Sequence, residues 1–275
     1  MTKQIVYNIP ATLIDSYRSR AVILRSSSPQ ELLYSLWRAD PLEVRFIQLL
    51  SPLTDTSVLE GSLENIPIEI VLEDPGEYEC LYDFANLVDS HPLRIAIPVV
   101  KGFSKAVKLA VSLDYAVKLQ VEQPDEFLLL ELEAVLDAYL HRSYVRQPIE
   151  FFHSLLSSFY REEPSSLWEI LEEDPTQLCY VTDDGRETIS RRFVGLPQGA
   201  NLPEFVNRLA RQLLAEKTEC YNCEFFDRCQ GYFKWPDKNY DCEGVKRLLR
   251  GLLTATQDVR RDLSNFQTAG VHAQS

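Results

Sequence analysis

The sequence lacks an excess of basic residues, a long apolar run and an apolar leader. Its 41 acidic residues outnumber 28 basic ones, which gives a formal net charge of −13. A surface of that sign repels nucleic acid and anionic membranes, so we expect neither as a partner. No apolar run approaches the roughly 18 residues of a membrane span. The first 20 residues lack the apolar core of a signal peptide, so we expect a cytoplasmic protein.

Familiar catalytic signatures are also missing. The sequence contains neither a Walker A loop nor a G-x-G-x-x-G turn. None of its four histidines has a serine or cysteine partner that the sequence alone would justify. The paired acids in residues 172–175 and 182–185 are typical of a helix end and a turn. We therefore predict no catalytic residue.

What is present in the first half is a regular alternation of two apolar periodicities. The period-two patterns typical of strands occupy residues 42–50, 66–73, 93–100 and 115–122. Helical spacing occupies residues 77–90, 102–113 (with Ser104 as a possible cap) and 124–143. Strands that alternate with helices predict an α/β fold, with parallel β/α units joined by right-handed crossovers. The pattern resembles part of a β/α barrel.

The pattern changes after residue 141. Helical spacing is found in residues 147–161, 165–174, 201–217 (opened by Asn201) and 245–263. Residues 178–193 predict a hairpin around the turn Asp183-Asp184-Gly185. We therefore expect two domains, a β/α unit in residues 1–175 and a smaller α+β unit with a C-terminal helix in residues 176–275.

Four of the six cysteines are concentrated in one short segment: Cys220, Cys223, Cys229 and Cys242. In the cytoplasm thiols stay reduced, so clustered cysteines indicate metal ligands rather than disulfides. Four thiolates can hold tetrahedral zinc or a [4Fe–4S] cluster, and spacing alone leaves both open. Aromatic side chains in the same segment would limit solvent access to such a centre.

The last hundred residues resemble the SPASM domain of radical S-adenosylmethionine (SAM) enzymes that modify peptides. That pattern has a cysteine on a hairpin strand, a Gly-x4-Cys, a C-x2-C-x5-C-x3-C run and a distant cysteine. Here Cys220, Cys223 and Cys229 match the C-x2-C-x5-C run, and Cys242 matches the distant cysteine. The resemblance implies that these four bind one auxiliary [4Fe–4S] cluster.

The resemblance also implies that a second auxiliary cluster is absent. Its ligands would come from the hairpin and from the fourth position of the run. Of these positions only Cys179 is a cysteine, whereas Ser190 and Phe233 occupy the other two. For Cys179, as for the isolated Cys80, we expect a place in the core rather than a ligand role.

The largest departure from the family is the missing C-x3-C-x2-C motif, which binds the SAM-cleaving cluster in radical SAM enzymes. Cys80 is the only cysteine before residue 179. The chain therefore resembles a degenerate radical SAM protein, with residues 1–175 as a partial β/α barrel and residues 176–275 as a SPASM-like iron–sulfur domain. We expect no SAM binding and no catalysis by the chain alone.

These features lead to an expected role in peptide maturation. The chain would be an accessory subunit that docks a precursor peptide or a catalytic radical SAM partner, with anchors from the aromatic segment 231–236 or from a free sheet edge. The basic residues in 245–261 are typical of a solvated face, with a docking face for an acidic peptide as the alternative. Two alternatives stay open: an iron–sulfur enzyme that acts on a peptide in its own right, and a zinc-stabilised scaffold.

Overall fold

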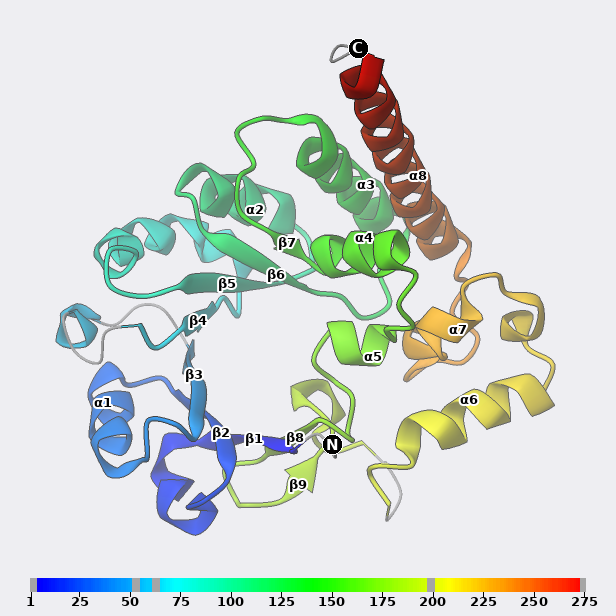
Figure 1. Cartoon of the computed structure of the whole chain (residues 1–275). Coiled ribbons are helices and arrows are strands. Elements are labelled where there is room, and N and C mark those ends of the chain that lie inside the picture. Colours follow the sequence, from blue (N-terminus) through cyan, green and yellow to red (C-terminus); the bar gives the residue numbers. More distant parts are fainter. Residues whose placement is uncertain (1–3, 51–54, 61–64, 197–200, 273–275) are drawn as a thin grey trace.

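The computed structural model describes residues 4–50, 55–60, 65–196 and 201–272, and these form a nine-stranded sheet with helices packed around it (Figure 1). The α/β class predicted from the sequence is confirmed. In chain order the strands are β1 (Val6–Pro10), β2 (Ala21–Ser26), β3 (Val44–Leu50), β4 (Ile68–Val71), β5 (Leu93–Pro98), β6 (Ala116–Gln120), β7 (Ile149–Glu150), β8 (Leu178–Val181) and β9 (Glu187–Thr188).

The strand order is β7-β6-β5-β4-β3-β2-β1-β8-β9. All neighbouring pairs are parallel except β8 and β9, which form the predicted antiparallel hairpin. Sequential parallel strands with β8 beside β1 have the order of an eight-stranded β/α ring opened between β7 and β8. The short helix α5 (Leu167–Ile170) lies in that opening (Figure 1).

Helices connect the strands and follow them. The α-helices are α1 (Pro29–Arg38), α2 (Phe103–Ser112), α3 (Glu126–His141), α4 (Phe152–Arg161), α5, α6 (Phe205–Ala215), α7 (Phe226–Cys229) and α8 (Glu243–His272). The 3₁₀ segments are Ala11–Tyr17, Ser57–Leu59, Pro75–Leu87, Arg191–Phe193, Glu219–Asn222 and Tyr232–Lys234. Among the described residues no helix is both long and apolar enough to cross a membrane.

Side-chain caps explain where several helices begin. Ser28 accepts a hydrogen bond from the Glu31 N–H at the start of α1, and Asp125 accepts one from the Leu128 N–H at the start of α3. The cap predicted at Ser104 is wrong, because α2 begins after Gly102 and the Ser104 hydroxyl donates to a glutamate of α3. Asn201 does not open α6 either. That helix begins at Phe205, without a side-chain cap.

The predicted alternation of strands and helices over residues 66–141 is confirmed, with one difference. The helical segment expected at 77–90 is the 3₁₀ helix Pro75–Leu87. The first 41 residues, which periodicity left unassigned, contain β1, β2 and α1. The helix expected over 147–161 is preceded by β7 and begins only at Phe152.

The sheet extends across the expected domain boundary at residues 175 and 176. Strand β8 pairs with β1 in parallel, from Val6 opposite Leu178 to Asn8 opposite Tyr180. The hairpin therefore belongs to the same sheet as β1–β7, and no second sheet occurs in the described residues. A continuous apolar core extends from the sheet to the cysteine segment, where it includes Cys220 and Cys242. The division into two domains stays a prediction.

Candidate functional site

The cysteine segment is built from three short turns and the start of α8. Thr218 caps the 3₁₀ helix Glu219–Asn222 by accepting a hydrogen bond from the Cys220 N–H. Helix α7 ends at Cys229, and the chain then turns through Gly231 at a φ of 79°. A Cβ there would lie 2.4 Å from the Leu213 side chain, so this turn requires glycine. These turns return the chain toward α8, which begins directly after Cys242.

All four predicted cysteines line one small cavity. Its volume is about 20 Å³, and its wall also contains Glu219, Phe225, Phe226, Phe233, Lys234, Val245, Lys246 and Leu249. Cys220 and Cys242 are buried, whereas Cys223 and Cys229 are partly exposed. The fold thus gathers side chains from three turns and a helix around one point. We call this arrangement the thiol cavity.

The donor set of the thiol cavity fits a metal centre in kind, but its present geometry is not that of a loaded one. No group of three or more His, Cys, Asp or Glu side chains in the described residues is placed to hold a metal ion. A volume of about 20 Å³ also holds little more than one water molecule. The thiol side chains and the turns that carry them would therefore have to rearrange to admit either zinc or a cluster.

Burial and hydrogen bonding act in opposite directions on these thiols. Burial raises the pKa of Cys229 to about 11, although backbone N–H groups of Gly231, Tyr232 and Phe233 point at its sulfur and oppose the rise. Burial also raises the pKa of Cys242, against the nearby Lys234 ammonium. N–H groups aimed at a cysteine sulfur and adjacent cations are features that stabilise thiolate bound to a metal.

The remaining cysteines lie away from the thiol cavity. Cys80 is buried in the 3₁₀ helix Pro75–Leu87, and Cys179 on β8 lines a separate small cavity near Tyr7. Ser190 donates a hydrogen bond to Glu173, 3.0 Å away, and Phe233 is buried beside the four thiols. No second group of thiols is brought together in the described part of the chain.

The aromatic segment 231–236 is mostly packed inside the protein. Tyr232 and Phe233 are 2% and 1% exposed, and Trp235 stacks on Phe193 with ring centroids 5.4 Å apart. These rings therefore join the cysteine segment to the core instead of offering free anchors. The basic residues of α8 are likewise occupied, because they pair with acidic side chains of this chain: Lys246, Arg247, Arg250, Arg260 and Arg261.

A second group of polar residues, which the sequence reasoning missed, crosses the inner face of the sheet. Arg25, Gln48, Glu69 and Arg94 are register partners on four adjacent strands, β2 to β5. Opposite positions on neighbouring strands face the same side of a sheet. We call these four residues the polar row.

Hydrogen bonds join the polar row from end to end. Arg25 donates to the Asn8 carbonyl and side-chain oxygens at 2.8 and 3.1 Å, and Asn8 donates to Gln48 at 2.7 Å. Gln48 donates to Glu69 at 2.5 Å, and Arg94 pairs with Glu69. Glu69 is only 1% exposed. A carboxylate at that depth needs such partners, because burying a charge without them is costly.

Glu172 joins the segment after α5 to the polar row. Its carboxylate pairs with Arg94 at 2.8 Å and with the Lys118 ammonium on β6. Burial favours the neutral acid, but the charges of Lys118 and Arg94 outweigh it and lower the pKa of Glu172 to about 2. These ion pairs lie between two cavities. Lys118 and Glu172 line both of them, and Arg94 lines one.

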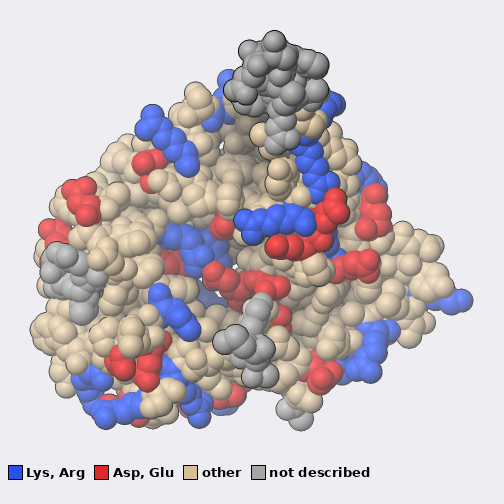
Figure 2. Space-filling view, in the orientation of Figure 1, with Lys and Arg blue, Asp and Glu red and all other residues tan. Residues whose placement is uncertain are grey.

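The second functional candidate is the one of these two cavities that Lys118 and Glu172 line without Arg94. It has a volume of about 420 Å³ and is lined by the carboxyl ends of the parallel strands, by the segment after α5 and by Tyr232. In Figure 2 charged side chains of both signs lie in and around the hollow at the centre of this face. We call it the strand-end cavity. Ligand sites of open α/β sheets occur at this end of the strands.

Comparison of the chain with family models, with curated proteins and with solved structures found no match. The candidate sites therefore rest on the residues and their geometry.

The first prediction concerns the buried carboxylate of the polar row. Glu69→Gln should lower the free energy of unfolding by about 3 kcal/mol, because it removes the negative charge that Arg94 and Lys118 share with Glu172. Glu73→Gln is the matched control. Its ion pair with Arg191 is more than half exposed on both sides, so it should cost less than about 1 kcal/mol. Urea denaturation measures both, and equal losses would contradict a stabilising role for the polar row.

The second prediction concerns acid stability. A carboxyl whose pKa is lower in the folded state contributes stability above its unfolded pKa and loses it as the pH falls. The contribution of Glu172, on the order of 2 kcal/mol, should therefore disappear between about pH 5 and pH 2. Urea midpoints of the unmodified chain and of Glu172→Gln should differ at pH 7 and converge in acid. A difference that stays constant with pH would show that the ion pairs are not its source.

Proposed function

We propose that the chain binds one [4Fe–4S] cluster and acts as an accessory subunit of a peptide-modifying radical SAM system. In this proposal Cys220, Cys223, Cys229 and Cys242 hold the cluster, and the chain docks a precursor peptide or the catalytic partner. The observation that carries the proposal is the convergence of these four cysteines on the thiol cavity. Their spacing matches the SPASM pattern, and the remaining two cysteines lie elsewhere.

The surroundings of the thiol cavity support an anionic centre. Lys234 is 4% exposed and pairs with Glu219 at 2.5 Å, and Lys246 pairs with the other oxygen of Glu219 at 2.6 Å. The two ammonium groups line the cavity beside the thiols. When bound, the cluster would supply either structural cross-linking or one-electron transfer. The residues of the chain contribute the sulfur ligands, the N–H groups aimed at Cys229 and the compensating positive charge.

The sheet supports the relation to radical SAM proteins and the loss of their reaction. Its strand order fits a partial β/α barrel followed by a hairpin. The SAM-cleaving cysteines of the family follow the first barrel strand. Here the segment after β1 is the 3₁₀ helix Ala11–Tyr17, which contains no cysteine. The chain therefore lacks cysteines at the family's position for the SAM-cleaving cluster, and in this proposal its contribution to a modification reaction is to hold a peptide or a partner.

The third prediction is the metal content. Protein purified without oxygen should contain about four irons per chain and absorb broadly near roughly 400 nm. Replacing any one of Cys220, Cys223, Cys229 and Cys242 by Ala should lower the iron content and loosen the segment, because metal binding and local folding are coupled. Cys80→Ala and Cys179→Ala are the matched controls and should keep the iron. A colourless protein that contains one zinc and no iron would contradict the cluster and favour the zinc-stabilised scaffold.

The fourth prediction is a stable complex. Co-expression with a catalytic radical SAM enzyme and its precursor peptide should yield a complex that contains this chain, measured by gel filtration and by mass spectrometry of the modified peptide. Omitting the chain should reduce the yield of modified peptide by at least about tenfold, as expected when productive docking is lost. A chain that elutes alone, beside a partner that modifies its peptide equally well without it, would refute the accessory role.

A further inference from the structure

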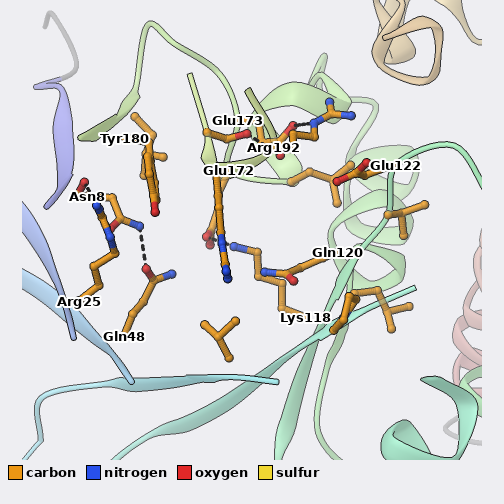
Figure 3. Close-up of a pocket in the computed structure, with 18 of the residues that line it drawn as sticks. Asn8, Arg25, Gln48, Lys118, Gln120, Glu122, Glu172, Glu173, Tyr180 and Arg192 are labelled. Carbon is orange, nitrogen blue, oxygen red and sulfur yellow. Dashed lines mark hydrogen bonds and ion pairs between the residues drawn. The ribbon is translucent and has the colours of Figure 1, made fainter. Parts of the chain in front are cut away.

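We propose that the strand-end cavity binds a short zwitterionic peptide, with the carboxylate beside Arg25 and Tyr180 and the ammonium beside Glu122. The inference rests on the charges and free polar groups of the cavity and does not depend on a metal in the thiol cavity. Figure 3 shows the two ends: Asn8, Arg25, Gln48 and Tyr180 lie on one side, and Glu122 lies on the other.

The first end carries a buried positive charge with little compensation. Arg25 is 3% exposed, and three of its hydrogen bonds go to neutral oxygens of Asn8 and Val181. Among the described residues its one acidic partner is Asp183, which accepts a hydrogen bond at 3.4 Å and whose side chain is 93% exposed to water. A charge buried in this way attracts a counter-ion from the ligand.

Tyr180 adds a hydrogen-bond donor at the same end. Its ring lies 4.0 Å from the Arg25 guanidinium carbon, and its hydroxyl points into the open space of the cavity (Figure 3). That hydroxyl makes no hydrogen bond to another residue in the described part of the chain. A hydroxyl donor next to a buried guanidinium suits a carboxylate.

The opposite end carries two acidic side chains and one basic side chain. Arg192 and Glu173 neutralise each other through a 2.7 Å ion pair. Glu122 follows β6 at the rim, is exposed and makes no ion pair with a described residue. Glu122 also attracts the Arg192 guanidinium at longer range, but two carboxylates share that one cation, so this end keeps a net negative charge. An ammonium group would restore the balance.

The middle of the cavity is neutral and offers amide groups. Lys118 and Glu172 compensate each other there. Gln48 already bonds Asn8 and Glu69, whereas the side-chain amide of Gln120 has no hydrogen bond to a described residue and extends into the cavity (Figure 3). An amide of this kind can donate to and accept from a peptide group. A lone anion would leave both Gln120 and Glu122 unused.

The size of the cavity agrees with a ligand of a few residues. A volume of about 420 Å³ lies within the range of small-molecule sites. The cavity also opens at the carboxyl ends of the strands, where loops leave ligands access.

Isothermal titration calorimetry on the full chain tests the proposal with four probes: triglycine, N-acetyl-triglycine, triglycine amide and glycine. Triglycine should bind most tightly, and blocking either terminus should weaken binding about tenfold, the loss of one charge-assisted hydrogen bond. Glycine should bind at least tenfold more weakly than triglycine, because its two charges lie too close together to reach both ends.

Variants assign each end. Glu122→Gln should weaken the binding of triglycine about tenfold and abolish the difference in affinity between triglycine and N-acetyl-triglycine. Triglycine amide should still bind more weakly than triglycine. Tyr180→Phe keeps the aromatic ring over Arg25 and should reduce the difference in affinity between triglycine and triglycine amide. Glu216→Gln is the matched control. It makes the same charge change at a half-exposed site paired with Lys238, and it should leave every affinity unchanged.

Four results would overturn the inference. The first is equal binding of triglycine and both blocked forms, and the second is an equal effect of Glu122→Gln and Glu216→Gln. The third is glycine that binds as tightly as triglycine, which would assign the cavity to a free amino acid. An absence of binding by all four probes at about 10 mM, well above the affinity of a specific site, would also refute it.

Discussion

The ion pairs of Glu172 with Arg94 and Lys118 are the interaction on which the rest of the molecule depends. They join the segment after α5 to β5 and β6, across the opening between β7 and β8. A sheet that is not closed has no backbone hydrogen bonds to hold its two ends together. Side-chain ion pairs hold α5 in the opening instead, and α5 in turn reaches the cysteine segment. Its Trp168 donates to the Gln230 carbonyl at 3.2 Å and packs edge-on against Tyr232.

The cysteine segment is held equally firmly by the loop after β6. Gln123 donates to the carbonyls of Phe233 and Asp237 at 2.8 Å, and the Tyr240 hydroxyl donates to the Pro124 carbonyl at 2.7 Å. These bonds satisfy backbone groups of a segment whose regular structure before α8 is limited to short helical turns. The position of the thiols is therefore set by the β/α part of the chain as much as by their own spacing.

The parts of the fold that could be predicted from the sequence are those whose periodicity reflects burial on one or both faces. Residues 66–141 alternate clearly because each strand is followed by a helix with an apolar stripe. The first 41 residues do not show this, since β2 is buried along its whole length and β1 continues directly into a 3₁₀ helix. The convergence of Cys220, Cys223, Cys229 and Cys242 could be anticipated, because close spacing limits how far turns can carry the thiols apart.

The polar row could not be recognised in the same way. Glu69 and Arg94 each stand among apolar residues in their strands, and a single charge in an alternating strand is typical of a solvent-facing position. Only the register shows that Arg25, Gln48, Glu69 and Arg94 lie opposite one another on the inner face. A partial signal was present, because β4 and β5 each carry a single polar residue and β2 and β3 carry two each, but it acquires meaning only once the strands are placed side by side.

Tyr232 is the residue at which the two candidate sites meet. Its ring lines the strand-end cavity, its hydroxyl donates to the Val121 carbonyl at 2.9 Å, and its backbone N–H points at the Cys229 sulfur. A ligand changes a distant site only if it interacts differently with two arrangements of the groups between them. Here a single residue lies between the cavity and the Cys229 thiol. A peptide that displaced the Tyr232 ring would also shift its N–H relative to the Cys229 sulfur, so the proposed peptide and the proposed cluster would influence each other through this one position.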